Sequence, residues 1–301
     1  MDSFDFNEKR KNKLEILRQL RLIDDVFMEK VFGEDIESTQ LLIRIILNNR
    51  NLKVVTLNKQ LPLSNLQGRS VRLDVLAVDE NNTIYNIEVQ RSDSGAVPKR
   101  ARYNSSLLDA NITTAGDSYS ALKETYVIFI TENDVLERNL PIYHIERVVK
   151  ELGEDFNDGA HIIYVNSSIQ DDTDLGRLMH DFYCTDADQM YYNTLAKRIK
   201  YFKEDSEGVN YMCELMDNLV LEGKAEGREL GRRETLIKTA KRMYQKGMSI
   251  SDISTMLDLK ETTVKKIIAS KNSSSDTNSS SADKMNYFGK RRSTKDKNEM
   301  K

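Results

Sequence analysis

The sequence predicts an α/β domain with a mixed β-sheet, followed by a helical C-terminal extension. Two β-rich runs, 71–79 and 83–90, are separated by a short Asn-rich turn, which is typical of a β-hairpin. Two continuous apolar runs, YVIFI at 126–130 and HIIYV at 161–165, are typical of buried strands. The pattern is helical from 175 to 270, so strands and helices alternate only in the first part of the chain.

Composition places the chain among globular proteins. Of its 301 residues, 39% are hydrophobic and 31% are charged, which excludes collagen-like, disulfide-rich and wholly disordered classes. No apolar run approaches the roughly 20 residues that span a bilayer, and the N-terminal MDSFDFNEKRKNK lacks the apolar region of a secretory signal. We therefore expect a cytoplasmic location and no membrane partner.

Several common kinds of site are not indicated. Cys184 and Cys213 lack CxxC spacing, and with the scattered His144, His161 and His180 they do not predict a zinc site. We expect reduced thiols and structural or surface histidines. The sequence lacks the glycine-rich loops GxxxxGK[ST] and GxGxxG, so nucleotide cofactors are not expected. It also lacks GxSxG, the commonest motif of serine hydrolases.

Charge is spread unevenly. The chain has a net charge of −3, so contact with nucleic acid is expected to be local or assisted by a metal. The serine-rich tail, 271–301, contains eight Lys/Arg and four Asp/Glu and is predicted to be disordered. Its Lys290-Arg291-Arg292 cluster is either a phosphate contact or simply solvated.

Helices are predicted on both sides of the hairpin. An apolar stripe over about 24–49 indicates helix with a break near Gly33. Residues 97–110 suit a helix with Pro98 in its first turn, where proline is tolerated.

Three glycines at every fourth position, Gly223, Gly227 and Gly231, would line one helix face. This face either permits homo-oligomer formation through close backbone approach or belongs to a solvated connector. Further on, Ser249 and Asp252 form a capping box, and a turn at 258–260 separates two short helices.

The 235–270 segment therefore has helix-turn-helix-like spacing, which suits either DNA binding or packing against a neighbour. We expect a division into an N-terminal arm at 1–20, an α/β domain at 21–200, a charged connector at 201–234, this small helical module at 235–270, and the tail at 271–301.

The hairpin carries the candidate site. Glu88 and Gln90 are two residues apart, so they share one face of their strand. If the loop is 80–82, its centre at residue 81 places Asp74 directly opposite Glu88, with Cβ atoms about 5 Å apart. Two facing carboxylates need a shared proton, a cation or a divalent metal. Oxygen ligands without nearby His or Cys favour Mg²⁺ or Mn²⁺. The alternative is an exposed hairpin whose acids are solvated or paired with Arg72 or Arg91.

Three segments together resemble the PD-(D/E)XK nuclease family transposases, also described as the Rpn family of recombination-promoting nucleases. These are Arg72-Leu73-Asp74, Tyr85-Asn86-Ile87-Glu88-Val89-Gln90 and Lys99-Arg100-Ala101-Arg102-Tyr103. Asp25-Val26-Phe27 resembles the family's opening, and the resemblance extends over roughly residues 20–270. It implies a restriction-endonuclease-like core.

The resemblance also implies roles. Asp74 and Glu88 would be the metal-binding carboxylates, and Gln90 would stand where the motif has a lysine. Glutamine can orient water but brings no charge to the transition state. Glu37 is the nearest candidate for an additional acid from the first core helix. Arg100 and Tyr103, three apart on one helix face, would either contact DNA phosphates or brace the helix on the sheet.

The predicted function is a Mg²⁺-dependent endodeoxyribonuclease that hydrolyses phosphodiester bonds and serves recombination or transposon-like mobility. The alternative is a weakly active or inactive nuclease fold that binds DNA or protein. A third possibility is a regulator in which the helix-turn-helix-like end dominates.

Overall fold

A computed structural model describes residues 3–59, 62–63, 71–92, 95–114, 116 and 118–270. The chain divides into two compact units, Met1–Met216 and Asp217–Lys301. The predicted disordered tail, 271–301, and its Lys290-Arg291-Arg292 cluster lie outside the described residues.

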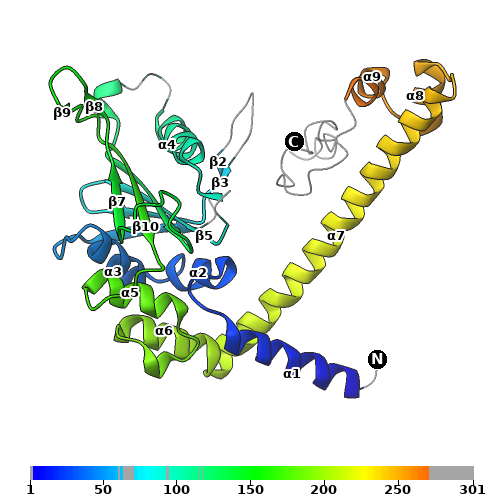
Figure 1. Ribbon diagram of the computed structural model, residues 1–301. Helices are drawn as coiled ribbons and strands as arrows, with labels where there is room; N and C mark the ends of the chain where they lie inside the picture. Colours follow the sequence, from blue (N-terminus) through cyan, green and yellow to red (C-terminus); the bar gives the residue numbers. More distant parts are fainter. Residues whose placement is uncertain are drawn as a thin grey trace, which may run out of the picture. The chain divides into compact units, whose positions relative to one another are not determined.

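A six-stranded mixed sheet with the order β1-β4-β5-β6-β10-β7 organises the first unit (Figure 1). Its strands are β1 (Val54–Lys59), β4 (Val75–Asp79), β5 (Ile84–Gln90), β6 (Thr125–Thr131), β7 (Ile142–Ile145) and β10 (Ala160–Asn166). Two small ribbons pair β2 (Pro62–Leu63) with β3 (Val71–Arg72) and β8 (Val148–Val149) with β9 (Glu154–Asp155).

The centre of the sheet is parallel and its edges are antiparallel. β5, β6 and β10 run parallel to their neighbours in this centre. β4 and β1 continue one side in antiparallel fashion, and β7 continues the other. The predicted mixed sheet is confirmed, and three of the four predicted runs form single strands; the run at 71–79 is divided into β3 and β4. β1 and β7 are strands that the sequence pattern did not predict.

Helices cover both faces of this sheet. The helical segments of the unit are α1 (Ser3–Gln19), α2 (Asp25–Phe32), α3 (Ile36–Ile46), α4 (Pro98–Ile112), η2 (Tyr119–Ala121), α5 (Asp174–Tyr183), η3 (Ala187–Gln189) and α6 (Asn193–Lys203). The predicted break near Gly33 separates α2 from α3. The side chain of Asp35 caps α3 by accepting a hydrogen bond from the backbone N–H of Ser38. Pro98 lies in the first turn of α4, as predicted.

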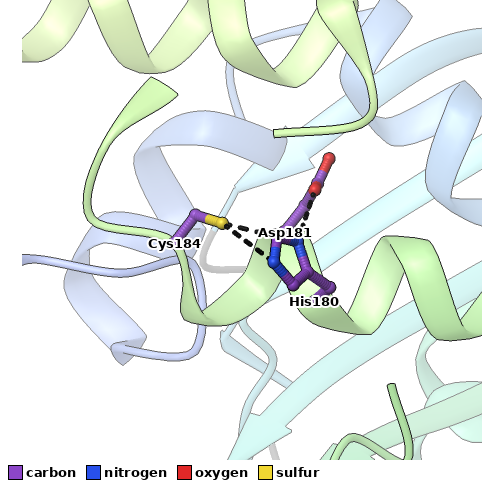
Figure 2. A group of neighbouring side chains, drawn as sticks. All are labelled: His180, Asp181 and Cys184. Carbon is purple, nitrogen blue, oxygen red and sulfur yellow. Dashed lines mark hydrogen bonds and ion pairs between the residues drawn. The ribbon is translucent and has the colours of Figure 1, made fainter. Parts of the chain in front are cut away.

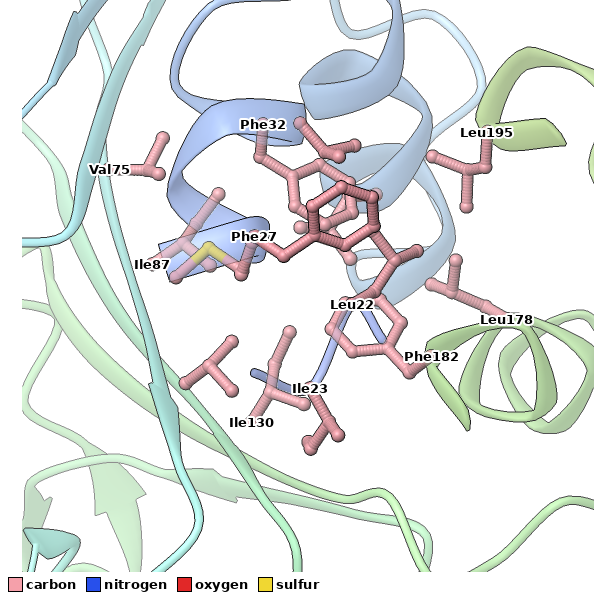
Figure 3. Packing of buried hydrophobic residues seen from close by; sticks show 14 of the residues in the cluster. Leu22, Ile23, Phe27, Phe32, Val75, Ile87, Ile130, Leu178, Phe182 and Leu195 are labelled. Atoms are coloured by element: carbon pink, nitrogen blue, oxygen red, sulfur yellow. The ribbon is translucent and has the colours of Figure 1, made fainter. Parts of the chain in front are cut away.

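Two hydrophobic clusters lie on opposite faces of the sheet. The larger joins the sheet to α2, α3, α5 and α6 around Phe27, Phe32 and Phe182 (Figure 3). The smaller joins it to α4. Because side chains alternate along a strand, Ile87 of β5 enters the larger cluster, whereas Glu88 points to the opposite face, which α4 covers. This alternation fixes the side of the sheet on which the candidate site lies.

The second unit contains most of α7 (Ser206–Gln245), followed by α8 (Ile250–Leu257) and α9 (Glu261–Ala269). α7 is one continuous helix across the expected boundary between residues 234 and 235. Apart from the neighbouring backbone of α7 itself, no described atom lies within 4 Å of where a Cβ would stand on Gly223, Gly227 or Gly231, so self-association through this glycine face stays a prediction. Across the described residues, none of the helices combines the length and apolarity that a membrane crossing requires.

Candidate active site

The β4–β5 hairpin has the predicted register. Val75 pairs with Ile87 and Val78 with Ile84. The loop is closed by the carboxylate of Asp79, which accepts hydrogen bonds from the backbone N–H groups of Asn81 and Thr83. Continuing this register by one pair places Asp74 opposite Glu88.

Asp74 does not lie inside a continuous strand, which corrects the expectation of one strand over 71–79. Arg72 ends β3 and Val75 begins β4, so Asp74 occupies a bend between them. The bend brings two backbone donors to the acids. The N–H of Asp74 donates to the Glu88 carboxylate, and the N–H of Val89 donates to the Asp74 carboxylate. The two acids are therefore held by each other's strand.

Glu88 is fully buried, and both of its oxygens have partners. Asn86, two residues earlier on the same face of β5, donates from Nδ2 to Oε1 at 3.3 Å. Arg100 of α4 donates from Nη2 to Oε2 at 3.3 Å. A buried carboxylate is strongly destabilising without such partners, so these two side chains are the reason that Glu88 can occupy the interior.

Arg100 also fixes Gln90. Its Nη1 donates to the amide oxygen of Gln90 at 3.2 Å. The backbone of Gly95 passes close to the same oxygen: a Cβ on Gly95 would stand 2.0 Å from Oε1 of Gln90. Only glycine leaves room for this approach. Gln90 is thus held between a guanidinium and a tight loop at the end of β5.

Burial raises the pKa of both acids. The pKa of Asp74 is raised to about 8, first by desolvation and then by the negative charges of Glu88 and Asp25, against the effects of the Val89 N–H and Arg100. Desolvation also raises the pKa of Glu88, against Arg100 and its hydrogen-bond donors. Without a further cation, the site therefore favours a protonated Asp74.

A third acid whose charge acts at the site is Asp25. Asp25 begins α2, and its charge acts on both Asp74 and Glu88. Desolvation raises the pKa of Asp25 itself, although its side chain keeps solvent exposure. Glu37 is an exposed residue in the first turn of α3. The signal that could have identified Asp25 was its place in the Asp25-Val26-Phe27 segment.

The three acids do not all lie within 4.8 Å of one another. The backbone N–H of Asp74 ties it to Glu88, and that of Val89 ties β5 to Asp74, whereas Asp25 comes from a helix on the other side of β5. Asp25 therefore contributes negative charge near the pair without completing a close group of three ligands.

The residues predicted on α4 divide between two roles. Arg100 contacts Glu88 and Gln90, and its side chain is 36% exposed, so it reaches from solvent into the site. Tyr103 packs against the hydrophobic cluster between α4 and the sheet. Tyr103 therefore braces the helix. A contact of either residue with DNA phosphate stays a prediction.

The donor set suits a hard divalent cation. Asp74 and Glu88 offer carboxylate oxygens from two bonded strands, and their raised pKa values mean that added positive charge would be favourable. Oxygen ligands of this kind favour Mg²⁺ or Mn²⁺ over softer metals. The residues thus fit such an ion.

A family model described as PD-(D/E)XK nuclease family transposase matches residues 22–174. The chain belongs to this family. The match spans the sheet from β1 to β10 together with α2–α4, and it includes Asp25, Asp74, Glu88 and Gln90. The restriction-endonuclease-like fold predicted for this PD-(D/E)XK protein is confirmed, and membership indicates a nuclease-type hydrolase in a family that generally uses divalent metals. Neither the curated proteins nor the solved structures returned a match.

A second group of possible ligands lies at the end of α5 in this PD-(D/E)XK protein. Within the described part of the chain, His180, Asp181 and Cys184 form the group whose ligand atoms lie within 4.8 Å of one another (Figure 2). Cys184 Sγ lies 3.5 Å and Asp181 Oδ1 lies 3.4 Å from Nδ1 of His180. The sequence pattern did not predict this contact between a cysteine and a histidine.

Other contacts give this group a structural role. Asp181 accepts backbone hydrogen bonds from Tyr191 at 2.8 Å and from Tyr192 at 2.9 Å, which ties the end of α5 to the start of α6. Burial and neighbouring carboxylates raise the pKa of the Cys184 thiol to about 11, so it is protonated near neutral pH. The oxygens and sulfur of this group are thereby committed to packing and hydrogen bonding.

Proposed function

We propose that this protein is a Mg²⁺- or Mn²⁺-dependent DNA endonuclease whose active site is built from Asp74, Glu88 and Gln90. The observation that supports it best is the buried pairing of Asp74 with Glu88, two acids with raised pKa values, in which Glu88 accepts the backbone N–H of Asp74 and Asp74 accepts that of Val89. Holding two acids close together in the interior lowers the stability of the fold. Destabilising arrangements of this kind are typical of functional sites.

The two carboxylates would hold the metal ion, which supplies the positive charge that polarises a phosphodiester. Asp74 and Glu88 would fix its position between the strands. Gln90, whose side chain is held by Arg100 and Gly95, would orient the attacking water through its amide. Its neutral side chain offers hydrogen bonds but no charge stabilisation.

Arg100 would have two successive roles. In the protein alone it neutralises Glu88. When a cation occupies the carboxylates, its partly exposed guanidinium would be available to the phosphate of the substrate, since guanidinium groups bind phosphate with two parallel hydrogen bonds. The biological role that we propose is the promotion of recombination or transposon-like mobility through DNA breaks.

One observation favours a second candidate function, a nuclease fold with weak or no turnover that binds DNA or protein. Gln90 replaces the lysine of the motif, and its amide oxygen already accepts a hydrogen bond from Arg100. In this candidate the acids would bind a metal without cleaving DNA.

Cleavage of supercoiled plasmid separates the two functions. Purified protein is incubated with plasmid in Mg²⁺, in Mn²⁺ or in EDTA, and nicked and linear products are measured. The endonuclease is supported by metal-dependent cleavage that the Asp74→Asn variant loses by at least about a thousandfold. Metal binding without cleavage of any DNA would favour the second candidate, and equal cleavage by wild type and Asp74→Asn would exclude the proposed site.

A further inference from the structure

The first unit of the chain and the helical segment at 235–270 carry opposite charge. Residues 1–216 contain 26 Lys/Arg and 36 Asp/Glu, whereas residues 235–270 contain seven Lys/Arg and three Asp/Glu. A domain with a net charge of −10 repels the phosphate backbone at long range, and a segment with a net charge of +4 attracts it. If the protein acts on DNA, its affinity for duplex must come largely from outside the nuclease domain.

The basic segment folds as a three-helix module with its own core. The end of α7 packs with α8 and α9 around Ala240, Ile253, Val264 and Ile267. The Ser249 side chain caps α8 by accepting a hydrogen bond from the N–H of Asp252, as predicted. These contacts make the module compact without help from the nuclease domain.

The turn between α8 and α9 is tight and specific. Asp258 follows α8 in the left-handed conformation, with φ of 51°, and its N–H returns to the carbonyls of Ser254 and Thr255. α9 begins at Glu261, so three residues separate the helices. Two short helices joined by such a turn and braced by a third form the geometry in which the second helix enters the major groove.

α9 presents the surface that such a role requires. Val264 and Ile267 face the core, and the exposed positions include Thr262, Lys265 and Lys266. With Ala269, these exposed residues follow i, i+3, i+4 and i+7 spacing, which places them on one face. All nine residues of α9 are described, and its exposed face has short, polar or cationic side chains and no large apolar one.

The lysines of this face are available to a ligand. Lys265 lies 4.0 Å from Glu261, and both side chains are at least half exposed, so their attraction is weak. Lys260 at the start of α9 is also exposed. A protein-docking face would offer apolar area instead, so the charge and the side-chain sizes favour DNA.

We infer that α9 is the recognition helix of a helix-turn-helix module, and that Lys265 and Lys266 bind duplex DNA in and beside the major groove. This inference rests on the proposed function in one respect only: the DNA bound here is the DNA that the nuclease domain would cleave. The acidic nuclease domain would then cleave the DNA, and the basic helical module would bind it.

The test measures binding of the full chain to a mixed-sequence duplex of about 30 base pairs by fluorescence anisotropy in EDTA, from about 50 to 200 mM salt. Lys265→Ala combined with Lys266→Ala is expected to weaken binding at least about tenfold and to lower the salt slope by about 2. The arginine pair, Lys265→Arg with Lys266→Arg, is expected to restore both. Alanine favours helix, and circular dichroism checks that the module stays folded.

The matched control removes the same charge elsewhere on the second unit. Lys224 and Arg228 are exposed on α7 before the three-helix module, and their joint replacement by alanine is expected to change binding by less than about threefold. The inference is overturned if the α9 variant binds within about threefold of wild type, as a protein-docking module would, if the control loses as much, or if the wild-type chain binds no duplex. If the wild-type chain binds duplex as expected but cleaves no plasmid in Mg²⁺ or Mn²⁺, the proposed nuclease is rejected and this inference stands.

Discussion

The guanidinium of Arg100 lies 3.3 Å from the carboxylate of Glu88, which is fully buried. A second N–H of the same guanidinium holds the amide of Gln90 at 3.2 Å. One cation on α4 thus fixes the last two functional side chains of β5. The guanidinium also neutralises the negative charge of Glu88 that would attract a metal ion, so Arg100 and the metal are expected to compete for Glu88.

Replacing Arg100 therefore separates metal binding from catalysis. In Arg100→Ala, Glu88 loses its counter-ion, so Mn²⁺ is expected to bind up to about tenfold more tightly. Cleavage is expected to fall about a hundredfold, because Gln90 loses its support and the phosphate loses a donor. Calorimetry and single-turnover cleavage measure the two effects, and Arg100→Lys serves as the control that keeps the charge. A parallel loss of metal affinity and cleavage would show that Arg100 supports the metal site instead.

Asp25 and Glu37 form a matched pair for locating the third acid. The charge of Asp25 acts on Asp74 and Glu88, so Asp25→Asn is expected to weaken Mg²⁺ binding by about three- to tenfold. Glu37→Gln, on the exposed start of α3, is expected to leave affinity within about twofold. Both are measured by calorimetry at low salt. The reverse order of effects would restore Glu37 as the additional acid.

Gly95 offers a way to disturb Gln90 without touching an acid. A Cβ in Gly95→Ala would stand 2.0 Å from the Gln90 amide oxygen, so the amide must move. Cleavage is expected to fall at least about tenfold while metal affinity is unchanged, because positioning of water is lost and both carboxylates remain. If cleavage stays at the wild-type rate, Gln90 does not orient the nucleophile.

The metal-free protein is expected to lose stability as pH rises. The pKa of Asp74 is about 8 in the folded chain and near its ordinary value of 3.8 when unfolded. Between about pH 4 and pH 8 the folded state therefore keeps a proton that the unfolded state has released, so the free energy of unfolding falls steadily as the pH rises across this window. Urea denaturation in EDTA at several pH values measures it. Asp74→Asn should flatten the curve, and equal slopes in both proteins would contradict the raised pKa.

Much of the site was predictable because strand pairing has a period of two. The three-residue loop at 80–82 fixed the β4–β5 register, and alternation then placed Asp74 opposite Glu88. Local patterns were also sufficient for the cap at Ser249 and the break near Gly33. These features depend on neighbours in sequence or on one hairpin.

Features that depend on tertiary contacts were not predicted. Asp25 reaches the site only because α2 packs on β5 through the larger hydrophobic cluster, and no local spacing records that contact. The sequence pattern indicated only a strand position for Asn86, although its side chain donates a hydrogen bond to Glu88. The bend at Asp74 was missed because the β-rich composition of 71–79 continues through it.

Titration of the metal-free protein with Mn²⁺ by calorimetry tests the central claim most directly. Wild type is expected to bind with release of a proton below about pH 8, and Asp74→Asn and Glu88→Gln are each expected to weaken binding at least about tenfold and to abolish that release. Full-affinity binding by both variants would show that these two acids do not share an ion, and the proposed active site would then be wrong.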